Sequence, residues 1–255
     1  MEITLRPTSF ADIEAPVRAH LAGFQSPTDS FYENHVLRSS HCQIVVEGSC
    51  GGFASIHQET LVTQFALEPD YRHLGQRAFF ELRRTASVQA AFVPTSDEFF
   101  LTHALDEYRS LAKQAYFFTV AEERIQSPPS GYRLQIATPK DAVIIHEETD
   151  DFLEPVEASI AKGHVFLAYR DNELVGFGIM EVSMLREATA SIGMFTRKSM
   201  RGQGVATGIV ALMIEEARKR DLTPVAGCWC ANHASKRTLE RAGMYSPTRL
   251  LRVEY

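Results

Sequence analysis

A short glycine-containing segment, Arg201-Gly202-Gln203-Gly204-Val205-Ala206, constrains the fold more than any other part of the chain. It lies between a strand-like run, residues 190–196, and a strongly helical run, residues 207–220. Two glycines allow the backbone to turn tightly and to bring its N–H groups close to a ligand. The helix that begins there leaves unpaired N–H groups and a partial positive charge at its first turn. Together with the Arg201 side chain, these features predict an anion site, most often for phosphate.

Two common phosphate-binding motifs do not fit this segment. A Walker loop needs Gly-Lys-Ser/Thr after four spacer residues, and that sequence is absent. A dinucleotide fingerprint needs Gly-x-Gly-x-x-Gly in a βαβ unit, with an acidic residue at the end of the second strand. The glycines here are 202, 204 and 208, and the next strand-like run ends at Cys230-Ala231-Asn232 without an acid. The strand before the loop also reads as part of an antiparallel hairpin, so a dinucleotide-dependent oxidoreductase is disfavoured.

The elements around the loop follow a defined order. Strand-like runs cover residues 164–169, 174–182 and 188–196, and after the loop come a helix over 207–220, a buried strand over 225–230 and a further helix. The turn signal Asp171-Asn172 separates the first two strands. Asn232 is a good N-cap for the last helix, which Gly243 would end.

These residues resemble the GNAT superfamily of N-acyltransferases. Its acyl-CoA pyrophosphate loop reads Gln/Arg-x-x-Gly-x-Gly/Ala, and the segment 201–206 matches that pattern. Asn232-x-x-Ser235 followed by Gly243-Met244 resembles the second cofactor motif of the family, Asn-x-x-Ala/Ser ending in Gly-Phe. Both motifs fall at the family's places in the order of elements, and the resemblance covers residues 164–244. It implies an α+β fold in which a mixed, mostly antiparallel sheet is flanked by helices.

The resemblance also implies acetyl-CoA as a co-substrate. Backbone amides of the strand before the loop would pair with the pantetheine arm, and the loop amides would hold the pyrophosphate. Asn232 and Ser235 would contact the arm or its phosphate end. The residues expected to bind the cofactor are Met194, Phe195, Thr196, Arg201, Gly202, Gln203, Gly204, Val205, Ala206, Thr207, Asn232 and Ser235.

The first half of the chain reads as a distant copy of the second. A shift of 129 residues superposes Arg72 on Arg201 and Gly75 on Gly204. A strand-like run, residues 61–66, precedes this counterpart of the loop. We therefore predict tandem GNAT-like domains, with residues 1–126 as the first and residues 132–255 as the second. The connecting residues 127–131, Ser-Pro-Pro-Ser-Gly, are rich in residues that break helices and strands.

The first copy is degenerate at the positions that would meet the cofactor. Arg77 replaces the small residue that lets the pyrophosphate approach, and His103 occupies the position of Asn232. We expect that only the second half binds acetyl-CoA. The first half is expected to pack on the second and shape the acceptor pocket, or to carry the interface of a homodimer.

Composition excludes several other classes of protein. The net charge of −6, without a basic run, argues against a nucleic-acid binder. No leader sequence or membrane-length apolar run is present, so we expect a cytoplasmic protein with no membrane partner. The four cysteines, Cys42, Cys50, Cys228 and Cys230, form no Cys-x-x-Cys pair and have no histidines at zinc-ligand spacing. We therefore expect no metal site and reduced thiols.

The implied reaction is attack of an amine on an acetyl thioester, which needs a base and a proton for the leaving thiolate. Many members of the family place a tyrosine seven residues after the motif asparagine, but here that position is Leu239. The candidates are Glu181 as the base, with Cys230, Tyr245 or water protonating the thiolate. The carboxylate of Tyr255, at the end of a strand-like run expected beside the site, is a further candidate.

An acidic stretch early in the second half bears on the acceptor. It comprises Glu147, Glu148, Asp150, Asp151, Glu154 and Glu157. In GNAT folds this region overhangs the acceptor site, where it would attract a cationic amine; a solvated helix face explains the same residues. The leading hypothesis is an N-acetyltransferase that moves an acetyl group from acetyl-CoA to a primary amine of a small molecule by direct attack. The alternative is a non-catalytic acyl-CoA-binding sensor or scaffold.

Overall fold

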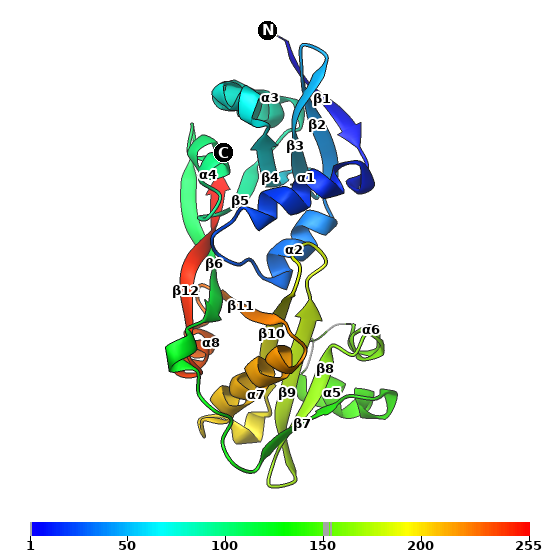
Figure 1. Ribbon diagram of the computed structural model, residues 1–255, viewed down its shortest axis with the longest axis vertical. Helices are drawn as coiled ribbons and strands as arrows, with labels where there is room; N and C mark the ends of the chain where they lie inside the picture. The colour runs from blue at the N-terminus through cyan, green and yellow to red at the C-terminus, as the bar shows by residue number, and fades with distance from the viewer. Residues whose placement is uncertain (1, 150–152, 154) are drawn as a thin grey trace. The chain divides into compact units, whose positions relative to one another are not determined.

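The computed structural model describes residues 2–149, 153 and 155–255 of the 255-residue chain. The chain forms two compact units (Figure 1). The first unit comprises Met1–Phe117, Met184–Arg186 and Pro247–Tyr255, and the second comprises Phe118–Ser183 and Glu187–Ser246. These units are interleaved along the chain, whereas the sequence-based division into residues 1–126 and 132–255 is linear. That division stays a prediction.

The first unit is built on a mixed sheet. Its elements, in chain order, are β1 (Ile3–Thr8), α1 (Phe10–Ala22), α2 (Ser30–Leu37), β2 (Ser40–Val46), β3 (Ser49–His57), β4 (Leu61–Leu67), the short 3₁₀ helix η1 (Pro69–Leu74), α3 (Gly75–Thr85), β5 (Ala90–Pro94), α4 (Glu98–Ala104) and the first part of β6 (Ser110–Val120). The strand order is β1-β2-β3-β4-β5, followed by the second part of β12 (Met244–Glu254) and then β6. From β1 to β12 in this order, pairing is antiparallel except between β4 and β5, which run parallel.

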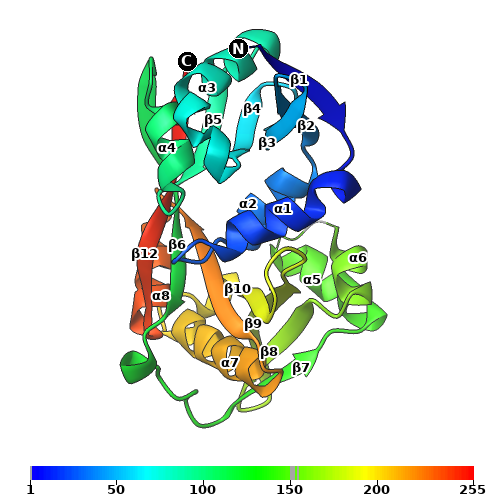
Figure 2. The same ribbon diagram turned by 45° about the horizontal axis from the view of Figure 1, so that its top comes forward.

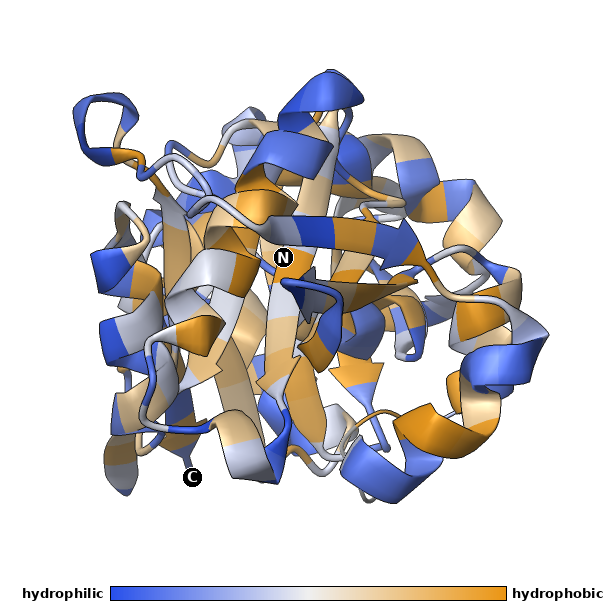
Figure 3. Cartoon of the chain, turned by 90° about the horizontal axis from the view of Figure 1, so that it is seen from below, coloured by the Kyte–Doolittle hydropathy of each residue, from blue (hydrophilic) through white to orange (hydrophobic). Residues whose placement is uncertain are grey.

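Two helical layers cover the two faces of this sheet (Figure 2). One core contains buried residues of α3 and α4, such as Phe79 and Phe100, and the other contains residues of α1 and α2, such as Val17 and Val36. Helix α1 begins with a capping box, in which Ser9 and Asp12 satisfy each other's backbone N–H groups. Figure 3 shows the result in hydropathy, because the helices carry alternating hydrophilic and hydrophobic residues while the strands are mostly hydrophobic.

The second unit repeats this plan. Its elements are β7 (Tyr132–Ile136), α5 (Ala142–Thr149), α6 (Val156–Ala161), β8 (Val165–Arg170), β9 (Glu173–Val182), β10 (Thr189–Thr196), α7 (Val205–Lys219), β11 (Thr223–Trp229) and α8 (His233–Arg241). The strand order is β11-β10-β9-β8-β7, antiparallel except for the β10–β11 pair. The predicted strands and helices around the loop are all present, and the α+β fold with tandem GNAT-like domains is confirmed.

Helix α7 lies close against the centre of this sheet, because two strand positions lack side chains. A β-carbon at Gly178 of β9 would lie 2.2 Å from Sδ of Met213, and one at Gly176 would lie 2.8 Å from Cδ1 of Ile209. The opposite face carries α5 and α6, whose buried residues pack on Phe177. The close approach of α7 sets where the loop before it meets the end of β10.

The C-terminal strand differs from the expectation that it lies beside the cofactor site. Residues Leu250–Glu254 of β12 pair antiparallel with Ala90–Pro94 of β5, so they complete the sheet of the first unit. The Tyr255 ring packs against Phe79, and its hydroxyl donates a hydrogen bond of 3.1 Å to the carbonyl oxygen of Ala104. The expected place of Tyr255 in the second unit's site is therefore wrong, and no role in catalysis is assigned to it.

Candidate functional site

Strands β10 and β11 part after a short common stretch. They pair in parallel only from Thr189 to Ser191 on β10, opposite Thr223 to Val225 on β11. On its other side β10 stays paired with β9 as far as Thr196, opposite Gly176. In the described part of the chain, residues 192–196 of β10 therefore have no ladder with β11. Their backbone groups offer an extended ligand the same hydrogen bonds as a neighbouring strand would.

The end of this open edge brings three of the predicted cofactor residues together. Nε of Arg201 donates to the carbonyl oxygen of Thr196 at 3.4 Å, and its guanidinium carbon lies 5.5 Å from the centre of the Phe195 ring. The Thr196 hydroxyl is buried and has no hydrogen-bond partner among the described residues. A buried hydroxyl without a partner costs free energy, which a polar ligand at this position would recover. Met194, also predicted, is half-buried on the same strand.

The loop after β10 has the backbone geometry of an anion site. Gly202 and Gly204 both have φ of +77°, a left-handed conformation that favours glycine. A β-carbon at either glycine would meet no atom within 4 Å, so the space in front of the loop is open. Gly204 is the N-cap of α7 and supplies no side-chain cap, so the N–H groups of Val205 and Ala206 at the first turn lack helical partners. The loop and the helix dipole thus point at one open position.

The Gln203 side chain anchors the loop to neighbouring residues. Its side-chain oxygen accepts a hydrogen bond from Nη2 of Arg170 at 3.2 Å, and its side-chain nitrogen donates to the carbonyl oxygen of Ser199 at 3.3 Å. Thr207 closes the turn with a backbone hydrogen bond of 3.1 Å to the Gly204 carbonyl. These contacts hold the glycines in place before any ligand arrives.

The second predicted motif is a helix cap. The side-chain oxygen of Asn232 accepts a hydrogen bond of 3.0 Å from the backbone N–H of Ser235, as the sequence predicted for the start of α8. The thiol of Cys228 donates to the Asn232 carbonyl at 3.3 Å. Burial is the main cause that raises the pKa of Cys228, so this thiol is protonated at neutral pH.

Glu181, the predicted base, lies where β10 and β11 are still paired. It stands opposite Ser191 on β10, and Ser191 stands opposite Val225 on β11. Residues that pair across neighbouring strands share a face of the sheet, so Glu181 and Ser191 belong to the face that also carries Phe177 and the helices α5 and α6. The carboxylate is partly exposed there.

His164 was missed by the sequence analysis. Its carbonyl oxygen accepts a hydrogen bond of 2.8 Å from the backbone N–H of Met180, so His164, just before the start of β8, lies near Glu181 at the end of β9. Burial lowers the pKa of His164, and the Glu181 carboxylate opposes that shift. The signal that could have found it is the turn at Asp171-Asn172, because its register brings the residues before β8 alongside the end of β9.

The other two catalytic candidates are Cys230 and Tyr245. Cys230 is half-buried in the turn after β11, and the Tyr245 side chain on β12 is 46% exposed. Among the described residues, neither forms a hydrogen bond with Glu181 or with the loop. Their proposed roles stay predictions.

Two of the described residues of the acidic stretch have basic neighbours. Glu148 forms an ion pair with Arg197, with a nitrogen–oxygen distance of 2.6 Å, and Glu157 lies 3.0 Å from Nε2 of His146. Glu147 is exposed, while Asp150, Asp151 and Glu154 lie outside the described residues. The preference for a cationic acceptor therefore stays a prediction, and Glu147 is the described residue of the stretch that still supports it.

In the first unit β4 and β5 also part after a short paired stretch, and aromatic rings pack beyond it. Strands β4 and β5 pair only at two positions, Leu61 with Ala90 and Val62 with Ala91. Beyond them, the rings of Phe65 and Phe99 stack with centres 5.6 Å apart. The His103 ring lies 4.7 Å from the Phe99 ring.

His103 also covers the start of the helix that corresponds to α7. A β-carbon at Gly75 would lie 2.1 Å from Nε2 of His103, so the ring occupies the space in front of the first turn of α3. Gly75 has a helical φ of −52° instead of the left-handed conformation of Gly204. The start of α3 in the first unit is thus covered, whereas the loop before α7 in the second unit is open. That only the second unit binds acetyl-CoA stays a prediction.

Two kinds of feature are absent from the described residues. No group of three or more His, Cys, Asp or Glu side chains in that part of the chain is arranged to hold a metal ion. None of its helices combines the length and the apolarity that crossing a bilayer requires.

Comparisons with known proteins agree with this geometry. A family model described as "Acetyltransferase (GNAT) domain" matches residues 9–121, and one described as "Acetyltransferase (GNAT) family" matches residues 130–244. No curated protein matches the chain.

Solved structures share the fold at low sequence identity. An acetyltransferase from the GNAT family of Colwellia psychrerythraea is 18% identical, with 100% of both chains covered and a TM-score of 0.87. A tandem GNAT protein from the clavulanic acid biosynthesis pathway is 16% identical over 100% of this chain and 98% of its own, with a TM-score of 0.64. A GCN5-related N-acetyltransferase from Sphaerobacter thermophilus is 14% identical over 99% of this chain and 95% of its own, with a TM-score of 0.63.

Proposed function

Because the chain belongs to the GNAT superfamily of acetyltransferases, we propose that its second unit transfers an acetyl group from acetyl-CoA to a primary amine of a small molecule. Acetyl transfer is the activity of the family; the donor, the amine acceptor and the direct attack are the parts that we propose. One observation carries the proposal. The open edge of β10 ends at an open glycine loop in the second unit, whereas His103 covers the corresponding position in the first unit.

This arrangement suits a long donor with an extended arm and a diphosphate. The arm would lie along residues 192–196 of β10, and the diphosphate would accept hydrogen bonds from the first N–H groups of α7. The Arg201 guanidinium and the Thr207 hydroxyl would add contacts at the same end. The unpartnered Thr196 hydroxyl lies between the two parts of the site.

The acetyl end would then lie toward Ser191, where β10 and β11 come together. The amine nitrogen would attack the thioester carbonyl carbon, a C–N bond would form, and the C–S bond would break. Glu181 would accept the amine proton directly or through water, with His164 beside it. The thiolate would take a proton from Cys230, Tyr245 or water. Holding both reactants in register lowers the barrier by about 7 to 11 kcal/mol in well-oriented systems.

A non-catalytic acyl-CoA-binding sensor is not favoured. Both family models describe acetyltransferases. Turnover separates the two functions directly, since a sensor would bind acetyl-CoA and release no thiol with any acceptor.

The test is a thiol-release assay with acetyl-CoA and a panel of amino acids, polyamines, aminoglycosides and peptide N-termini. Gly204→Glu places a carboxylate in the open space before the loop, and we expect it to abolish release. Gly48→Glu is the matched control, because Gly48 has a similar φ of +84° and equally open surroundings in the turn between β2 and β3. Gly75→Glu is unsuitable as a control, because its side chain would collide with His103. No release by the wild type across the panel, or equal loss in both variants, would contradict the proposal.

A further inference from the structure

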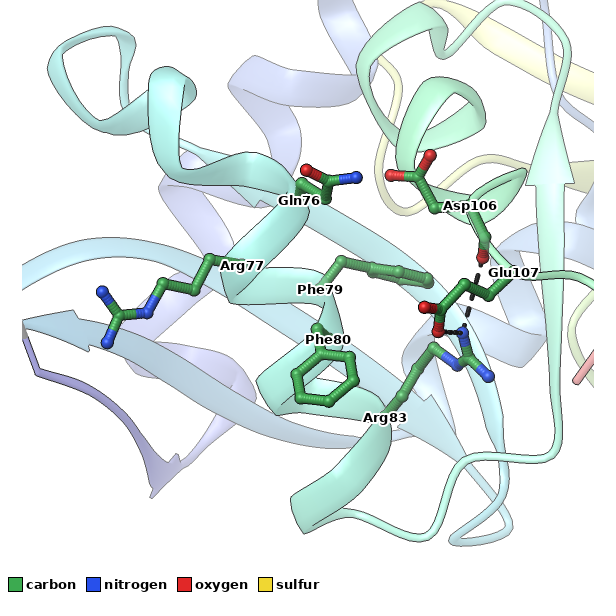
Figure 4. A pocket seen from close by; sticks show the side chains of 7 residues that line it. All are labelled: Gln76, Arg77, Phe79, Phe80, Arg83, Asp106 and Glu107. Atoms are coloured by element: carbon green, nitrogen blue, oxygen red, sulfur yellow. Dashed lines mark hydrogen bonds and ion pairs between the residues drawn. The ribbon is translucent and has the colours of Figure 1, made fainter.

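A cavity lies in the first unit, between α3 and the turn that follows α4. Its volume is about 310 Å³, near the lower end of the range of about 300 to 1,000 Å³ that small-molecule sites occupy. Figure 4 shows the side chains that line it. Gln76, Phe79, Phe80 and Arg83 come from α3, and Asp106 and Glu107 come from the turn. Arg77 also borders the cavity, but in Figure 4 its guanidinium points away from Asp106.

The positive charge inside this cavity is already engaged. The Arg83 guanidinium lies 3.6 Å from the Glu107 carboxylate and 3.4 Å from the Asp106 carbonyl oxygen. It also covers the face of the Tyr255 ring at 3.9 Å. An anionic ligand would therefore have to displace these contacts and approach two carboxylates.

The Asp106 carboxylate faces a histidine ring instead of a guanidinium group. It accepts no hydrogen bond within the described residues, and the closest basic nitrogen, Nδ1 of His103, is 3.7 Å away. This distance exceeds that of a charged hydrogen bond, which is about 2.7 to 2.9 Å. The Asp106 side chain is 41% exposed, so it can meet a ligand from the cavity side.

The wall beside this carboxylate is aromatic. The Phe79 side chain is buried, with 2% of its surface exposed, whereas Phe80 one position along α3 is 50% exposed. An exposed ring beside a cavity offers apolar area to the body of a ligand. The face of such a ring also attracts a cation.

We propose that this cavity binds a primary amine carried on an aromatic or aliphatic body. The ammonium group would donate hydrogen bonds to Asp106. The apolar body would lie against Phe79 and Phe80. The cavity consists only of first-unit residues, so the proposal stands independently of acetyl transfer by the second unit.

Three probes of matched shape test the charge preference in the full chain without acetyl-CoA. They are 3-phenylpropylamine, 3-phenylpropan-1-ol and 3-phenylpropanoate, each titrated by calorimetry. We expect the amine to bind about tenfold or more tightly than the alcohol, because a hydrogen bond to a charged group contributes more than a neutral one. The carboxylate should bind most weakly. Equal binding of all three probes, or no binding of the amine, would overturn the proposal.

Two variants test whether the amine binds in this cavity. Asp106→Asn should weaken amine binding about tenfold or more and leave the alcohol unchanged. Phe80→Ala removes an exposed ring, so the fold is kept, and it should weaken the amine and the alcohol alike. Arg84→Gln is the control, because Arg84 is 66% exposed and pairs with Glu81 outside the cavity.

Gly204→Glu separates this site from the proposed transfer site. We expect amine binding in the absence of acetyl-CoA to persist in that variant, while thiol release is lost. If amine binding disappears in Gly204→Glu, or survives unchanged in Asp106→Asn, the amine does not occupy this cavity.

Discussion

The Nε2 atom of His103 lies 2.1 Å from the position that a β-carbon on Gly75 would take. The ring is held there by Phe99 and Phe65, so it cannot easily turn away. The contact explains why position 75 requires glycine, although no open loop precedes α3. Packing, and not an approaching phosphate, requires glycine at this position.

The first prediction follows from this contact. Gly75→Ala should lower the free energy of unfolding by about 1 to 3 kcal/mol, the usual cost of overpacking. Gly193→Ala is the comparison, because its β-carbon would meet Ile179 at an ordinary 3.6 Å. Denaturant unfolding measures both. In the double variant Gly75→Ala/His103→Ala the clash is absent, so the two changes should be strongly non-additive; simple additivity would show that the contact does not matter.

The second prediction concerns the number of cofactor sites. Because His103 covers the start of α3 in the first unit, calorimetry should detect one acetyl-CoA site per chain. Gly204→Glu should abolish that binding, and Gly48→Glu should leave it unchanged. A stoichiometry of two would mean that His103 and Phe99 move aside to admit a ligand.

The third prediction separates the two roles of Asn232. Asn232→Ala removes the cap of α8 and should cost about 1 kcal/mol of stability. It should also weaken acetyl-CoA binding. Asn232→Asp keeps a capping oxygen, so stability should return while a cofactor contact made by the amide nitrogen stays lost. Melting temperature and calorimetry measure the two effects, and wild-type values of both in Asn232→Ala would refute the assignment.

The fourth prediction tests the proposed base. Glu181→Gln should reduce kcat about a hundredfold with little change in acetyl-CoA affinity, because a base acts in the chemical step. Glu173→Gln is a control on the same strand, where the side chain is exposed. His164→Asn should shift the acidic limb of the pH–rate profile if His164 takes part. Unchanged turnover of Glu181→Gln from pH 6 to 9 would make Glu181 a structural residue.

The fifth prediction concerns pH and stability of the first unit. Burial lowers the pKa of His41, and it is also the main cause that lowers the pKa of His57, with the nearby His35 and Arg38 contributing. The unfolded chain keeps the ordinary value of about 6.5 and so binds more protons below that pH. The free energy of unfolding should therefore fall as the pH decreases from about 7 toward 5.5.

Chemical denaturation across this range measures the effect. His41→Phe should reduce the slope of stability against pH. His146→Asn, which changes an exposed histidine of the second unit, leaves these two buried rings in place and serves as the control. A slope that is the same in all three proteins would show that the buried histidines are not responsible.

Several features of the second unit could be predicted from the sequence because they depend on neighbours along the chain. The loop at residues 201–206 combines two left-handed glycines with a helix start, and both are local backbone preferences. The cap formed by Asn232 with Ser235 spans three residues. Each of these appears in the structure as predicted.

Other features required the tertiary structure because their partners are distant in sequence. A strand has the same pattern whichever partner it takes, so the pairing of β12 with β5, and with it the place of Tyr255, could not be derived from residues 244–255 alone. The pairing of Glu148 with Arg197 likewise joins residues 49 positions apart, and it compensates one charge of the acidic stretch. Local backbone preference determined the loop, while long-range packing decided which strand completes each sheet and which charges stay unpaired.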